Sequence, residues 1–192
     1  LERDACLAEQ LQNREKPVNN FSPSLLRSIL SSAVAAWLIT LASDFMFHAV
    51  FFSYWWRDTE DYWLPPMQLF QFIPFAYVSF ALYCVTLNWL LVRLYGPRPS
   101  MRQGLQFGAS AGFVYGTITI LANYSLFPLP LSALLVWPFS MIIDSAAAGA
   151  ASAWVLNAPH PWRRVGVIFG IAIGLFILGI IIQNVFFPAV TV

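Results

Sequence analysis

The sequence predicts an all-α protein, a polytopic transmembrane bundle of five helices. Apolar residues make up 59% of its 192 residues and charged residues only 10%, against about 25% charged residues in an average soluble domain. Five apolar runs approach or exceed the ~20 residues that a helix needs to cross the hydrocarbon core of a bilayer. Most charged residues fall in the short gaps between these runs. We place the five spans near residues 25–53, 68–92, 104–127, 131–156 and 165–187.

The first two spans have local start signals. Ser22 and Pro23 fit an N-cap followed by proline at the first helical position. Pro65 and Pro66 end the loop before the second span. The second span contains Cys84, which we interpret as a small apolar packing residue. The other cysteine lies in the polar N-terminus, so we expect no disulfide.

The third and fourth spans are predicted to form an antiparallel hairpin. Residues 127–130 (FPLP) lie between them, and proline disfavours a helical conformation at the preceding residue. Small residues fill 146–151 of the fourth span, and glycines recur every four residues on the third. Small residues at this spacing let two helix backbones approach closely, so we expect packing within the protein. The third-span glycines are Gly104, Gly108, Gly112 and Gly116.

The fifth span is nearly all aliphatic, Phe and Gly residues between its ends. Its glycines, Gly166, Gly170 and Gly174, also recur every four residues. This face suits close helix contact, either with the protein's own bundle or with another subunit.

Lysine and arginine predict the orientation. With five spans, Arg57 is the only one of the ten Lys and Arg residues that falls on the second side of the membrane. Cytoplasmic loops are enriched in these residues, so we expect the N-terminus inside and the C-terminus outside. The predicted organisation is a cytoplasmic segment over 1–24, a four-helix core over 25–157, and an inner loop with the fifth helix over 158–192. The first 24 residues are polar, so we expect no cleavable signal peptide.

Ionisable residues inside the spans are the main clue to function. Asp44 and His48 are four residues apart, so they share one face of the first helix. Asp144 lies in the fourth span at a similar depth. An ionisable group in a span costs roughly 2.5–3.5 kcal/mol on insertion scales, and it normally faces the interior of the bundle. With polar residues at the outer ends of the second and third spans, these residues predict an outer polar pocket. The added members are Gln68, Gln71 and Asn123.

Three interpretations of this cluster compete. The residues fix helix register by hydrogen bonding, or they carry protons or cations, or they hold a ligand such as a lipid or a pigment on His48. One histidine and two acids are few for a divalent metal, which usually takes three or four protein ligands. We therefore predict no metal site, and no cofactor is required. No nucleophile motif, phosphate-binding loop or zinc spacing occurs, so an enzyme is not expected, and the net charge of +1 does not favour nucleic acid.

Several short motifs carry a family resemblance. They are residues 44–48 (DFMFH) followed by 55–57 (WWR), residues 104–108 (GLQFG) with Gly112 and Gly116, residues 126–130 (LFPLP), and Trp137. Together, over about residues 28–157, they resemble small uncharacterised bacterial membrane proteins of the "domain of unknown function" kind. The resemblance implies a four-helix core, an acid in the fourth span and a bacterial source, with no established activity. The polar N-terminal segment and the fifth span depart from it.

These observations lead to one expected function and two alternatives. We expect a non-catalytic accessory subunit of a larger bacterial inner-membrane complex, respiratory or photosynthetic, with the lipid bilayer and other membrane subunits as partners. The chain is small, has no catalytic motif and is rich in aromatic residues, at 17%. The first alternative is a small transporter or proton- or cation-conducting protein that uses Asp44, His48 and Asp144. The second is a pigment- or lipid-binding subunit.

Overall fold

The computed structural model describes residues 23–53, 66–126 and 130–186, and every regular element in these ranges is a helix. Helix α2 spans Pro23–Phe45 and continues as a π-helix, η1, over Met46–Phe51. The others are α4 (Pro66–Tyr95), α5 (Met101–Leu126), α6 (Leu131–Leu156) and α7 (Pro161–Phe186). Five helices are long and apolar enough to cross a membrane, so the predicted class, an all-α bundle with five transmembrane helices, is confirmed. The N-terminal segment predicted over 1–24 lies almost wholly outside the described residues.

Helices α2, α4, α5 and α7 begin a few residues before the predicted spans, and α4 also ends later, because caps and prolines that set helix ends can lie beyond the apolar run. Helix α4 ends before Gly96, whose φ of 84° is readily adopted only by glycine. Helix α5 begins at a capping box. There the Ser100 hydroxyl oxygen accepts from the Gln103 N–H at 3.2 Å, and Gln103 Oε1 accepts from the Ser100 N–H at 2.8 Å. Three helices, α2, α4 and α7, begin with proline, which has no N–H to leave unpaired there.

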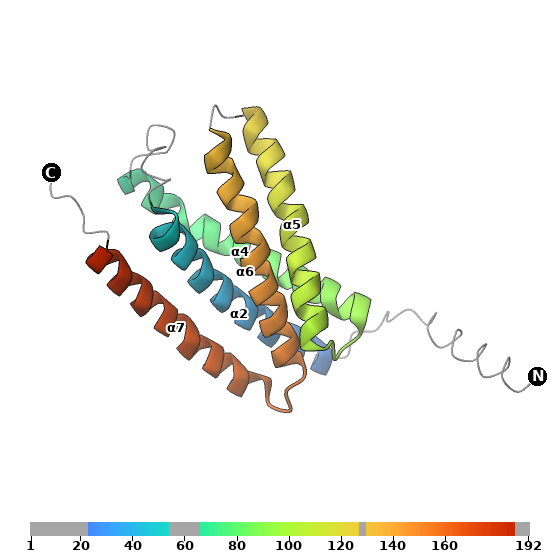
Figure 1. The fold of residues 1–192 in the computed structure, drawn as a ribbon. Coiled ribbons are helices and arrows are strands. Elements are labelled where there is room, and N and C mark those ends of the chain that lie inside the picture. The colour runs from blue at the N-terminus through green and yellow to red at the C-terminus, as the bar shows by residue number, and fades with distance from the viewer. Residues whose placement is uncertain (1–22, 54–65, 127–129, 187–192) are drawn as a thin grey trace, which may run out of the picture.

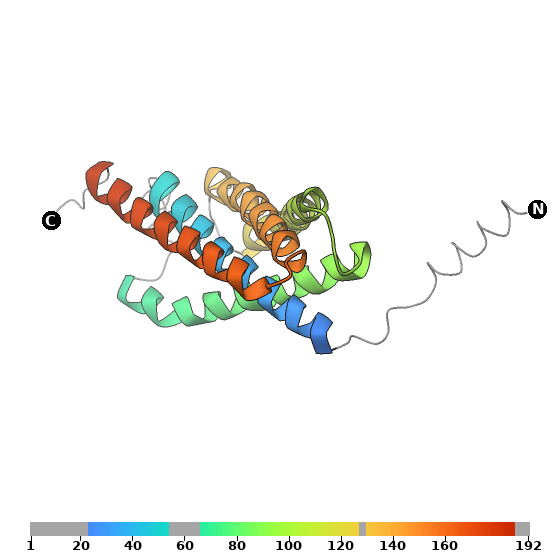
Figure 2. The same ribbon diagram turned by 90° about the horizontal axis from the view of Figure 1, so that it is seen from below.

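Helix α2 is the centre of the bundle. It packs against α4, α6 and α7, whereas α5 packs mainly on α6. In Figure 1 the α5–α6 pair crosses the α2–α7 pair obliquely, and Figure 2 shows α4 crossing beneath α2. A helix with neighbours on three sides needs small side chains for close approach. The buried residues of α2 fit this need, since all but the first are small: Ile29, Ser31, Ser32, Ala33, Ala35, Ala36, Thr40 and Ala42.

The α5–α6 contact is made by backbone. All four glycines of α5 are buried. A Cβ built on Gly108 would lie 2.0 Å from the Ser145 carbonyl oxygen, and one on Gly112 would lie 2.2 Å from the Met141 carbonyl oxygen. In return, a Cβ on Gly149 of α6 would lie 2.1 Å from the carbonyl oxygen of Gly104. The glycine Cα–H groups therefore lie directly against carbonyl oxygens, an arrangement that adds weak hydrogen bonds to dispersion.

Polar contacts fasten the end of the bundle that holds the α4–α5 and α6–α7 loops. The Asn157 side-chain amide at the end of α6 donates to the Pro99 carbonyl oxygen at 2.6 Å. The guanidinium of Arg164 donates to the Trp154 carbonyl oxygen and lies over the Trp154 ring, 5.0 Å from its centroid. These contacts join α6 to the loop before α5 and to the start of α7.

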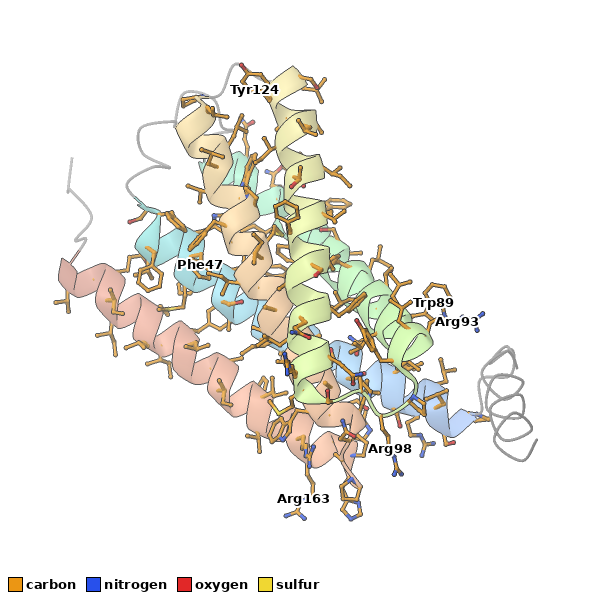
Figure 3. All side chains as sticks on the ribbon, turned by 45° about the vertical axis from the view of Figure 1, so that its right-hand side comes forward. Phe47, Trp89, Arg93, Arg98, Tyr124 and Arg163 are labelled. Carbon is orange, nitrogen blue, oxygen red and sulfur yellow. The ribbon has the colours of Figure 1, made fainter. Side chains whose placement is uncertain are left out.

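All described arginines lie at this same end. Figure 3 shows Arg93, Arg98 and Arg163 there, with Tyr124 at the opposite end of the bundle. The remaining ones are within the first five residues of their helices: Arg27, Arg102 and Arg164. Because cytoplasmic loops are enriched in arginine, we expect this end to be the cytoplasmic one, and we refer to it as the inner end.

Cysteine accessibility tests this orientation. In a protein whose native cysteines are replaced by serine, we expect an impermeant maleimide added to intact cells to label Ser125→Cys. It should label His160→Cys only after permeabilisation, because Ser125 ends α5 and His160 lies in the α6–α7 loop at the arginine-rich end. Both positions are exposed, so burial does not confound the comparison. Labelling of His160→Cys alone in intact cells would reverse the orientation.

Candidate functional site

Two of the three predicted ionisable residues contact each other through their side chains. His48 Nε2 lies 3.2 Å from Asp44 Oδ1 on the same helix. The side chains are 21% and 24% exposed respectively, so the pair lies at the surface of the bundle. The i, i+4 spacing that predicted this contact gives the geometry directly. Asp44 lies about 10 Å before the end of η1, at 1.5 Å per residue.

The helix changes type between these two residues. Helix η1 begins at Met46, directly after α2, and includes His48. Its last turn is closed by the Phe52 N–H, which donates to the Phe47 carbonyl oxygen at 2.8 Å. Aromatic rings pack against it: the Phe47 centroid lies 5.9 Å from that of Phe52 and 6.3 Å from that of Phe139 on α6. The π-helical turn ends the first span, and it carries His48.

Asp144 is the third member and the most unusual one. It lies near the middle of α6 and is only 1% exposed. Neither of its carboxylate oxygens has a hydrogen-bond partner among the described residues. Across the helix interface it interacts with Ser43, Asp44 and His48 of α2. A buried carboxylate without hydrogen bonds is costly, so this residue is not explained as a contact that fixes helix packing.

The hydroxyl groups around Asp144 make hydrogen bonds to other groups. Ser43 Oγ donates to the Ile39 carbonyl oxygen at 2.9 Å and lies 3.2 Å from that of Thr40. On α6, Ser145 Oγ lies 2.7 Å from the Tyr83 hydroxyl oxygen of α4, in a hydrogen bond between the two side chains. Thus Ser43 and Ser145 each have a hydrogen-bond partner other than Asp144, whereas a carboxylate needs donated protons.

Sequence reasoning missed Ser43, Tyr83 and Ser145 as neighbours of the cluster. Ser43 precedes Asp44 and Ser145 follows Asp144, so adjacency was an available signal. It is a weak one, because a hydroxyl in a helix usually bonds to its own backbone, as Ser140 does to the Trp137 carbonyl oxygen at 2.9 Å. Nothing in the sequence indicates that Tyr83 reaches from α4 to α6.

The wider predicted pocket needs correction. Gln68 and Gln71 are exposed, and Asn123 donates to the Thr119 carbonyl oxygen of its own helix at 2.9 Å. The physical reason is the oblique course of α4, whose first turns lie apart from the other helices in Figure 2. The structure therefore brings together Asp44, His48 and Asp144, but not the two glutamines and the asparagine.

Among the described residues, no group of three or more His, Cys, Asp or Glu side chains is arranged to hold a metal ion. His48 uses Nε2 in its contact with Asp44, so a pigment or metal bound at that nitrogen would have to displace Asp44. The arrangement can hold and pass protons, since it contains two carboxyl groups and an imidazole within one cluster.

The glycines of α7 are arranged differently from those of α5. Gly166, Gly170 and Gly174 are exposed, and a Cβ on any of them would meet nothing within 4 Å. Helix α7 packs on α2 through its opposite face, where Val165 and Ile168 are buried against Ala35 and Val155. The glycine that does pack within the protein is Gly179, whose Cβ would lie 2.6 Å from the Phe45 ring; the sequence prediction did not single it out.

A cavity of about 660 Å³ lies at the inner end, far from the polar cluster along the helices. It lies between the start of α2, the α4–α5 loop and the end of α6, with polar atoms from Ser24, Ser28, Arg98 and Asn157. Comparison with protein-family models, with curated proteins and with solved structures gave no match. The resemblance over residues 28–157 therefore stays a prediction.

Proposed function

We propose that this protein is a non-catalytic accessory subunit of a larger membrane complex and that it docks through the glycine face of α7. We define this face as Gly166, Gly170 and Gly174. The observation that supports the proposal is their exposure: the three glycines lie in open space on the side of α7 turned away from α2.

The glycine repeat of α5 supports a docking role for the exposed glycines of α7. Both helices repeat glycine at intervals of four residues, and on α5 the repeat is filled by the backbone of α6. A glycine face of the same spacing on α7 has the shape that receives a helix from another chain. In soluble proteins glycine lowers helix stability by about 1 kcal/mol relative to alanine, so three exposed glycines in one helix call for a packing role.

The kind of complex follows from the rest of the chain. We place it in a bacterial inner membrane, on the resemblance of residues 28–157 to bacterial membrane proteins and on the arginine-rich inner end. The high aromatic content, 17%, accords with a respiratory or photosynthetic complex.

A bulky residue in the glycine face tests the proposal. We expect Gly170→Leu to leave the protein folded and inserted, because nothing lies within 4 Å of the added Cβ. The same change should abolish co-purification of partner subunits from the source membrane in mild detergent, because the leucine holds the partner helix away. The measurement is the subunit composition of the purified complex on a native gel.

Ile171→Phe is the matched control. Ile171 is exposed on the same helix but is turned about 100° away from Gly170, so this variant should still co-purify with the partners. Wild-type protein that purifies from its own membrane as a single band would contradict the subunit proposal. Retention of the partners by Gly170→Leu would contradict docking through α7.

A further inference from the structure

We infer that Asp144 and the Asp44–His48 pair form a proton-binding site that exchanges its proton with the outer aqueous phase. The inference is independent of the accessory role proposed above, since it concerns a different face of α2. It starts from the cluster of ionisable groups at the α2–α6 interface.

The first step concerns whether Asp144 is buried as a carboxylate or as a neutral carboxylic acid. Its side chain is 1% exposed, and both oxygens lack hydrogen-bond partners among the described residues. Desolvating a bare carboxylate is far more costly than desolvating a neutral carboxylic acid. The surroundings also suit the neutral acid, because the Ser43 hydroxyl donates to the Ile39 carbonyl oxygen and its own oxygen can accept a proton from Asp144. A protonated Asp144 carries an O–H group that can donate a hydrogen bond to the Ser43 hydroxyl oxygen.

The second step concerns the groups that face Asp144 from each helix. From α2 they are Asp44 and His48, and from α4 the phenol of Tyr83. Tyr83 is already hydrogen-bonded to Ser145 at 2.7 Å. The part of α7 inside the bundle, residues 165–186, contains no ionisable side chain. Asp44 and His48 are therefore the groups suited to take a proton from Asp144.

The third step is the path to the surface. Asp44 and His48 are 24% and 21% exposed, whereas Asp144 is enclosed. The proton leaves a carboxyl oxygen of Asp144 and is taken up by the His48 imidazole or by the Asp44 carboxylate. The pair then releases it to water at the outer side, so that charge and atoms balance with no further reactant. The π-helical turn presents His48 at this exit.

Infrared spectroscopy of the purified full-length protein tests the site. A protonated carboxylic acid has a C=O stretching band that is distinct from carboxylate bands and moves to lower frequency when the proton is replaced by deuterium. We expect such a band in the wild-type protein, and we expect its loss in Asp144→Asn, which keeps the size and shape of the side chain. After transfer to deuterated buffer the wild-type band should shift, and the shift should be slower in His48→Gln.

Labelling the aspartate carboxyl carbon with carbon-13 assigns the band to aspartate without any substitution, so the test does not depend on the folding of Asp144→Asn. Absence of an aspartic acid band in the wild-type protein would overturn the inference, as would its persistence in Asp144→Asn. A band that never shifts in deuterated buffer would show a fixed structural proton and would equally overturn it. An unchanged exchange rate in both His48→Gln and the double variant Asp44→Asn/His48→Gln would overturn the exit through the pair.

Discussion

Replacing Gly108 with alanine is expected to cost about 3 kcal/mol of stability, the upper part of the range for overpacking a close-packed interface. The added methyl carbon would lie 2.0 Å from the Ser145 carbonyl oxygen and 2.8 Å from its carbonyl carbon. Backbone atoms cannot rotate away as a side chain can, so α5 and α6 must separate along their whole contact. Thermal unfolding in detergent, followed by circular dichroism, measures the loss.

The same substitution at Gly170 is the matched control. This glycine is also in the middle of a long helix, but its added methyl group meets nothing within 4 Å. We expect Gly170→Ala to change stability by no more than about 1 kcal/mol, toward greater stability, because alanine is the better helix former. Equal effects of the two substitutions would show that the α5–α6 backbones are not in contact.

Replacing Asp144 with leucine is expected to stabilise the protein, which is an unusual direction for a substitution at a buried residue. Leucine has the same branched skeleton as aspartate, and it removes two buried oxygens that have no hydrogen-bond partner among the described residues. An unsatisfied buried polar group costs about 1–3 kcal/mol, so the gain should be of that order, less any cost of the larger methyl groups. Thermal unfolding of the wild-type and variant proteins in the same detergent measures it.

Asp44→Leu provides the comparison, because it should act in the opposite direction. Asp44 lies 3.2 Å from His48 Nε2, and its removal takes the carboxylate partner from the imidazole. The pair is partly exposed, so we expect a loss of about 1 kcal/mol. Destabilisation by Asp144→Leu greater than that by Asp44→Leu would contradict the prediction that the Asp144 oxygens lack hydrogen-bond partners.

The spans could be predicted from the sequence because each depends on local properties. An apolar run of about 20 residues and a cap or proline at its end are sufficient, as the capping box of Ser100 and Gln103 shows. The relative courses of the helices are not local. Gln68 and Gln71 were expected in the bundle because they start the second span on the outer side. They are exposed because α4 crosses α2 obliquely, and the crossing depends on which side chains meet at the interface.

The candidate site likewise has one part that could be predicted from the sequence and one part that could not. The contact between Asp44 and His48 follows from helix periodicity alone. The approach of Asp144 to that pair requires α2 and α6 to be neighbours with one particular rotation, which a single sequence does not give. The two glycine repeats illustrate the limit further, since sequences with the same spacing face a neighbouring backbone on α5 and open space on α7.

The pairing of Asp44 and His48 within one helix also has a consequence for biogenesis. The first span leaves the translocon before α6 has been synthesised, and an unpaired aspartate would then oppose its partition into lipid by roughly 2.5–3.5 kcal/mol. A partner four residues away travels with it, so this span carries its own side-chain contact for Asp44 during insertion. Asp144 has no such companion on α6, and it enters the bilayer when the first span is already in place to receive it. Asp44 is thus synthesised together with its partner, and Asp144 is synthesised after the helix that it packs against.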